Sequence, residues 1–132
     1  MYEKILVPLD GSKRAEMIRP HVRELASRFQ ATVILIMVIE YISPDGIAKT
    51  YTSISEKAFN DKLKKSESYL DGVASALQGK GIACKTIVAQ GPVVEKIIEA
   101  ANTEDVDLVS MTSHGYGGLA RIFYGSVAAG IL

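Results

Sequence analysis

The sequence has little of what usually marks a secreted or nucleic-acid-coating protein. It contains one cysteine, Cys84, so no internal disulfide can form, and a reducing, cytoplasmic environment is the simplest expectation. Lysine plus arginine equal aspartate plus glutamate at 15 each, which argues against a general polyanion binder that coats nucleic acid. A small anionic ligand is still allowed, because it needs only a local pocket.

Long hydrophobic runs are also missing. The longest, "VILIMVI" at 33–39, is far shorter than a transmembrane helix. The start, "MYEKILVPLDGS", has an apolar run that is too short and too soon followed by a charge for a signal peptide. We therefore expect a cytoplasmic protein without membrane insertion. Hydrophobic residues still make up 48% of the 132 residues, enough to bury a core in one domain spanning 1–132.

Strand-like and helix-like segments alternate along the chain. The strand-like segments are continuous apolar runs, which are typical of strands covered on both faces, as in parallel sheets. They read "KILVPL", "VILIMVI", "IACKTIVA" and "DLVSM". Alternation with helices predicts an α/β fold, an open, twisted parallel sheet with helices on both faces.

The helical segments are predicted from apolar residues at helical spacing. Pro20 lies in the first half of the first helix, in its first turns or at a kink. A capping box at Ser53–Glu56 and "GKG" at 79–81 mark the ends of a long second helix. Pro92 suits the first position of a third, and a fourth would begin at Ser126. The apolar faces comprise Ile18, Val22, Leu25 and Phe29, then Phe59, Leu63, Leu70, Val73 and Leu77, then Val93, Val94, Ile97, Ile98 and Ala101.

Glycines and hydroxyl residues surround a short segment near the end, in "TSHGYGGLARIFYGSV" at 112–127. The stretch follows the fourth predicted strand, where ligands of parallel sheets bind. Glycine backbone approaches an anion closely, and a helix beginning at Ser126 would offer further N–H donors. We predict a phosphate cradle in which "LARIFY" forms a flap. A plain turn explains the glycines equally well.

Several candidate residues have a simpler interpretation beside the functional one. Asp10 ends the first strand in the expected crevice, yet it could cap the next helix. Arg121 could face the ligand or solvent. His114 has no carboxylate or nucleophile nearby in the sequence, so structuring the loop is favoured over catalysis. Cys84 lies in an apolar run and is expected to be a buried structural thiol.

These features resemble the universal stress protein family over nearly the whole chain. "KILVPLDGS" is similar to the family's first strand and its aspartate, and "GYGGLARIFYGS" is similar to the end of its nucleotide motif, G-x2-G-x9-G-[ST]. Gly115 matches the second glycine, and Gly125–Ser126 match the last two positions. Thr112 stands where the family has the first glycine. A β-branched residue is less permissive there, although its hydroxyl could donate a hydrogen bond.

The resemblance implies a set of nucleotide-binding residues. Pro8, Leu9 and Asp10 would line the adenosine pocket, and Val38 would meet adenine through its backbone. Met111 and Thr112 would flank the nucleoside, with no residue assigned a catalytic role. The glycine segment would hold the phosphates, and its residues are His114, Gly115, Gly117, Gly118, Arg121, Gly125, Ser126 and Val127.

The implied function is that of an ATP-binding regulatory or stress-response protein with at most slow ATP hydrolysis. AMP or ADP are alternative ligands, and Mg²⁺ would be carried by the phosphates without protein ligands. A homodimer and a regulated protein partner are implied as well. The family's last strand, similar to "PVLVV", is missing from the sequence as given, which suggests a truncated record or a different dimer. The alternative function is a non-nucleotide protein-interaction module of the same fold.

Overall fold

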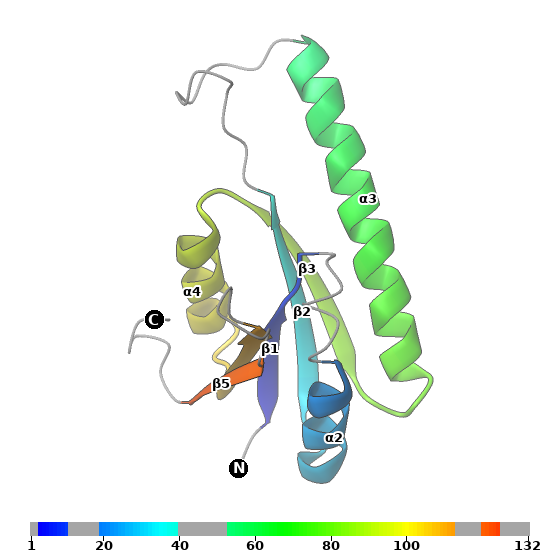
Figure 1. The fold of residues 1–132 in the computed structure, drawn as a ribbon, viewed down its shortest axis with the longest axis vertical. Helices are drawn as coiled ribbons and strands as arrows, with labels where there is room; N and C mark the ends of the chain where they lie inside the picture. The colour runs from blue at the N-terminus through cyan, green and yellow to red at the C-terminus, as the bar shows by residue number, and fades with distance from the viewer. Residues whose placement is uncertain (1–2, 11–18, 40–52, 113–119, 125–132) are drawn as a thin grey trace.

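The computed structural model describes residues 3–10, 19–39, 53–112 and 120–124 (Figure 1). These ranges form the predicted α/β fold, while the predicted fourth helix lies outside them. The elements in order are β1 (Lys4–Pro8), α2 (Arg19–Phe29), β2 (Thr32–Ile39), α3 (Ser53–Gln78), β3 (Cys84–Gln90), α4 (Val93–Thr103), β4 (Leu108–Thr112) and β5 (Ala120–Tyr124).

The strands form one sheet in the order β3-β2-β1-β4-β5. The four strands predicted from the apolar runs are parallel, as expected. β2 is paired on both sides, with Lys4–Thr32 to Pro8–Ile36 on the β1 side and Val33–Cys84 to Ile39–Gln90 on the β3 side. This double pairing, with a helical layer on each face, explains why β2 reads as an unbroken apolar run.

The segment predicted to be a flap is instead a fifth strand. β5 pairs antiparallel with β4, from Leu108–Tyr124 to Thr112–Ala120. It lies along the outer side of β4 in the plane of the sheet, so the prediction that "LARIFY" folds over a ligand is wrong. Isoleucine, phenylalanine and tyrosine are enriched in strands, and pairing satisfies the edge of β4.

Within the described ranges, α2 and α3 cover one face of the sheet and α4 covers the other (Figure 1). On the first face, Val22 and Ala26 of α2 and Leu70 and Leu77 of α3 pack on strand residues such as Leu35. On the second face, Ile97 and Ala101 of α4 pack on Leu6, Ile34, Ile36 and Val109. Side chains of a strand alternate between faces, so the same strands supply both cores.

α2 has a proline in its first turn. Pro20 is the second residue of α2, where its missing N–H leaves no helical bond unmade.

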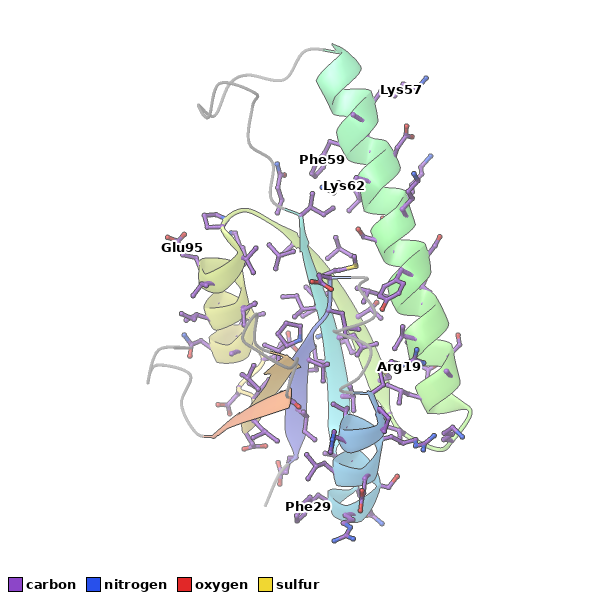
Figure 2. All side chains as sticks on the ribbon, viewed as in Figure 1. Arg19, Phe29, Lys57, Phe59, Lys62 and Glu95 are labelled. Carbon is purple, nitrogen blue, oxygen red and sulfur yellow. The ribbon has the colours of Figure 1, made fainter. Side chains whose placement is uncertain are left out.

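α3 has 26 residues and is therefore roughly 39 Å long. Its first turns, where Lys57, Phe59 and Lys62 are labelled in Figure 2, project beyond the strands. No helix in the described ranges is both long and apolar enough to cross a membrane.

The start of α4 differs from the sequence prediction by one residue. Pro92 is the N-cap, and the helix begins at Val93. Val93 and Val94 were predicted to belong to the apolar face, but they are 38% and 51% exposed. The prediction is wrong for these two side chains, which belong to the first turn of α4, before the residues Ile97 and Ala101 that pack on the sheet. Gly91 makes the preceding turn with φ of 140°, and a Cβ on it would lie 2.7 Å from Lys96 Cε.

Asp107 ties β1 to the end of α4 at the amino edge of the sheet. Its Oδ2 accepts hydrogen bonds from the N–H groups of Glu3 (2.7 Å) and Lys4 (3.0 Å). These two donors hold the pKa of Asp107 below its usual 3.8. Lys4 also reaches across, with Nζ 2.9 Å from the Glu104 carbonyl oxygen.

Cys84 begins β3 and is half-buried, less completely than the sequence suggested. Burial raises the pKa of its thiol to about 11, against a smaller opposing effect of the contact with the Lys85 carbonyl oxygen. The thiol is therefore protonated at neutral pH. This supports the structural role expected for it, because the thiolate is the reactive form.

Candidate functional site

The parallel strands end together at one edge of the sheet. From β1 the chain winds outward to β2 and β3, and it then crosses to β4 on the other side of β1. The winding therefore reverses between β1 and β4. In open α/β sheets this reversal point, beyond the carboxyl ends of the strands, is where ligands bind.

β1 and β4 are paired only near their beginnings. Their ladder consists of Ile5–Leu108 and Leu6–Val109. β1 nevertheless continues its pairing with β2 as far as Pro8, and β4 continues its pairing with β5 as far as Thr112. Each strand thus follows its outer neighbour beyond the shared ladder, as expected where a crevice opens between the two strand ends.

The backbone of Val38 is directed toward this crevice. Leu9 N–H donates to the Ile36 carbonyl oxygen on the β1 side of β2 (2.9 Å), and Gly91 N–H donates to the Ile39 carbonyl oxygen on the β3 side (3.1 Å). Alternate residues of a strand direct their backbone groups to opposite neighbours. Val38 therefore directs its N–H and C=O to the β1 side, one step beyond the Leu9–Ile36 bond.

The end of β1 places three predicted ligand contacts in different environments. Pro8 is half-buried and Asp10 is exposed. The Leu9 side chain is only 4% exposed and packs in the core under α2 and α3. A ligand in the crevice could therefore meet Leu9 through its backbone alone, whereas the Asp10 carboxylate is at the surface. The side chain of Val38 likewise packs in the α4 cluster, which leaves its backbone for the crevice.

On the β4 side, Met111 and Thr112 pair with Arg121 and Ala120 of β5. Arg121 was predicted in a flap, and it lies on this strand instead. The sequence analysis did not single out Ser110, which is fully buried. Its Oγ has no hydrogen-bond partner within the described part of the chain. A serine between Val109 and Met111 in an apolar strand was the only signal for it in the sequence.

The remaining predicted contacts lie outside the described residues and stay predictions. They are His114, Gly115, Gly117, Gly118, Gly125, Ser126 and Val127. Among the described residues, no group of three or more histidine, cysteine, aspartate or glutamate side chains is placed to bind a metal. A cation at this edge of the sheet would need ligands supplied by the bound molecule or by residues beyond these ranges.

The family model for universal stress proteins matches residues 1–132. The chain belongs to the universal stress protein family. The universal stress protein MJ0577 of Methanocaldococcus jannaschii is 28% identical over 144 residues, covering 100% of this chain and 89% of that protein. YxiE of Bacillus subtilis is 26% identical and covers 97% of this chain and 90% of that protein.

Solved universal stress protein structures share the fold. That of MJ0577 superposes with a TM-score of 0.75 at 29% identity, covering 90% of this chain and 80% of that one. A universal stress protein solved in complex with cAMP superposes with a TM-score of 0.60 at 18% identity, covering 82% of this chain and 74% of that one. The predicted family and fold are thereby confirmed.

Proposed function

We propose that the protein binds ATP in the crevice between the ends of β1 and β4 and acts as a regulatory, stress-response module. The observation that carries this proposal is the Val38 backbone, which presents a donor and an acceptor beyond the end of β1. An adenine edge offers the complementary pair of donor and acceptor groups. The cAMP complex of a relative with the same fold supports an adenine nucleotide as the ligand class.

In this proposal each part of the nucleotide has its own partners. Pro8 and the Leu9 backbone flank the adenosine, and the exposed Asp10 carboxylate accepts hydrogen bonds from adenine or ribose. Met111 and Thr112 close the other side. The glycine-rich segments at 114–118 and 125–127 hold the phosphates, whose oxygens bind Mg²⁺. ATP serves as a ligand that is hydrolysed slowly at most.

Titration calorimetry of the full chain with Mg²⁺ and ATP tests the proposal. We expect a dissociation constant below 1 mM, about −4 kcal/mol of binding free energy. Asp10→Asn should weaken binding by roughly tenfold, as expected for the loss of a charge-assisted hydrogen bond. Asp61→Asn, an exposed carboxylate of α3, removes the same charge away from the crevice and should change affinity less than twofold.

Two results would contradict the proposal. One is that no heat of binding is measured with ATP, ADP or AMP at millimolar concentration. The other is equal weakening by Asp10→Asn and Asp61→Asn, which would show that the Asp10 carboxylate makes no specific contact with the nucleotide. The first result would favour the alternative, a protein-interaction module without a nucleotide.

We also propose that the protein forms a homodimer. Strands β3 and β5 are at the two ends of the sheet order, and an edge strand offers unpaired backbone groups to a second copy. Light scattering after size exclusion should give about twice the chain mass of 14.3 kDa. A monomeric mass at 100 µM, with and without ATP, would exclude a stable dimer.

A further inference from the structure

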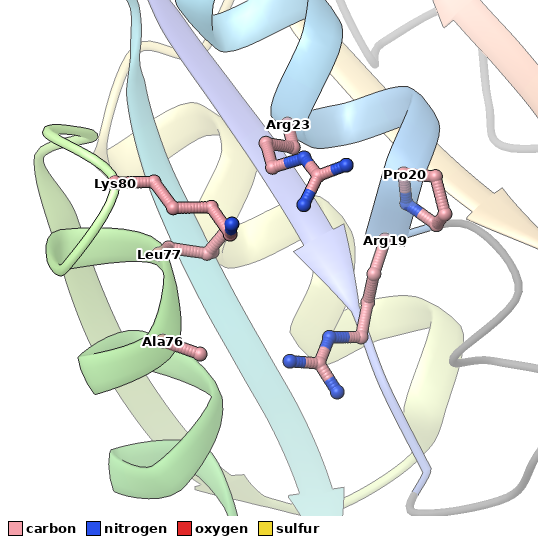
Figure 3. Close-up of a pocket in the computed structure, with 6 residues that line it drawn as sticks. All are labelled: Arg19, Pro20, Arg23, Ala76, Leu77 and Lys80. Carbon is pink, nitrogen blue, oxygen red and sulfur yellow. The ribbon is translucent and has the colours of Figure 1, made fainter.

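A groove lies between the beginning of α2 and the end of α3, on the face of the sheet that these two helices cover. Its volume is about 370 Å³, within the range that binds small molecules. The described residues that line it are Arg19, Pro20, Arg23, Ala76, Leu77 and Lys80 (Figure 3). None of them belongs to the set proposed for ATP.

Three cationic side chains line this groove, from α2 and from the end of α3. Figure 3 shows the guanidinium groups of Arg19 and Arg23 directed from α2 into the space beside α3, and the Lys80 ammonium group directed back toward α2. No aspartate or glutamate is among the described residues that line the groove. Arg28, at the other end of α2, pairs with Glu24 at 3.1 Å.

The helix dipoles favour the charge of Lys80 but not that of Arg23. Lys80 follows the end of α3, where a positive charge is favourable to the helix dipole. Arg19 and Arg23 lie in the first two turns of α2, the positive end of its dipole, and the first turn carries no acidic residue. The charge of Arg23 is unfavourable to that dipole, and a bound anion would offset this cost.

The floor of the groove is apolar and fixed by the core. Leu77 is only 5% exposed and lies above Val7, Leu35 and Val73 in the cluster under α2 and α3. Leu77 and Arg19 also border a small apolar cavity beneath, with Val22 and Leu35. The two helix ends that carry the cations are therefore held in place by packing, which lowers the entropic cost of binding.

We propose that this groove is a second anion site, which binds a small multivalent oxyanion of the phosphate type. Guanidinium groups bind phosphate oxygens with paired hydrogen bonds, and the ammonium group adds a point charge. Pro20 and Ala76 leave an apolar wall for the carbon skeleton of a phosphorylated metabolite.

Titration of the ¹⁵N-labelled full chain with inorganic pyrophosphate at constant ionic strength tests the site. We expect saturable shifts of the backbone amides at Arg19–Arg23 and Leu77–Lys80. The double variant Arg23→Gln, Lys80→Gln should weaken binding at least tenfold. Lys64→Gln with Arg28→Gln removes the same charge from exposed positions outside the groove and should change affinity less than twofold.

Each outcome decides the proposal. Shifts that do not saturate below 10 mM, or equal weakening by both double variants, would overturn it. Shifts confined to Leu9, Asp10 and the end of β4 would also overturn it while supporting the ATP crevice. Saturable binding at the groove in a chain that does not bind ATP would support the groove proposal and contradict the ATP proposal. Well-dispersed spectra confirm folding, and Lys80→Glu, which should abolish binding, replaces the double variant if folding is lost.

Discussion

Ser110 combines complete burial with a hydroxyl that has no hydrogen-bond partner among the described residues. Removing that hydroxyl loses no bond and ends the desolvation of a polar group. We expect Ser110→Ala to leave the free energy of unfolding unchanged or to raise it by up to ~1 kcal/mol. Urea unfolding followed by circular dichroism measures the difference. A loss above ~1.5 kcal/mol would show that the hydroxyl has a partner.

Asp107 makes the stability depend on pH. A carboxyl whose pKa is lower in the folded than in the unfolded state stabilises the fold above its unfolded pKa. This contribution is lost as the pH falls through the lower, folded value. Because Asp107 is only partly buried, we expect Asp107→Ala to lose about 1 kcal/mol at neutral pH. The difference from wild type should shrink as the pH falls below the unfolded value of 3.8.

Asp107→Asn is the matched control, because it keeps an acceptor oxygen for the Glu3 and Lys4 N–H groups without the charge. Its stability at neutral pH should lie between those of the wild type and Asp107→Ala. Stability curves of the wild type and Asp107→Ala that stay parallel from neutral pH to pH 3 would contradict the assignment of the low pKa to these two bonds.

Among the elements, α4 is one in which only part of the predicted apolar face is buried against the sheet. Val94 is 51% exposed, whereas Ile97, three residues later, is 2% exposed. We expect Ile97→Ala to lower the free energy of unfolding by about 2–4 kcal/mol, through lost burial and a cavity. Val94→Ala should change it by less than ~0.5 kcal/mol, as at other surface positions. Equal losses in urea unfolding would contradict this arrangement of α4.

The sequence was sufficient to predict most elements, because their signals are local. β2 reads as a continuous apolar run since it is buried on both faces, and α3 shows helical spacing along its buried half. The exposure of Val93 and Val94 was not predictable, because it depends on how α4 is placed on the sheet and not on the spacing of its own apolar residues. β5 was missed because its flanking glycines suggested a loop, although its own residues favour a strand.

The candidate site was predictable to a different degree in its two halves. Strand ends follow from the order of the elements, so Pro8, Asp10 and Val38 could be placed at one edge of the sheet. The burial of the Leu9 side chain could not be predicted, because it depends on which face of β1 packs against α2 and α3. The sequence could not predict that Arg19, Arg23 and Lys80 line one groove, because α2 and the end of α3 are distant along the chain.

For the molecule as a whole, the sheet separates two hydrophobic clusters. Ile82 packs in the cluster under α2 and α3, and Ile97 packs in the cluster under α4. We expect Ile82→Val and Ile97→Val each to lower the free energy of unfolding by about 1 kcal/mol. Because the two side chains share no packing partner across the sheet, the double variant should show the sum within about 0.5 kcal/mol.

A double variant within one cluster is the control for the additivity expected between the two clusters. Ile36 and Ile97 belong to the same cluster, so the cavities left by Ile36→Val and Ile97→Val share neighbours and their effects should couple. Both double variants should still unfold in one transition, because the strands contribute to both clusters and neither can dissolve alone. Coupling between Ile82 and Ile97 above about 1 kcal/mol would mean that the sheet transmits strain from one face to the other.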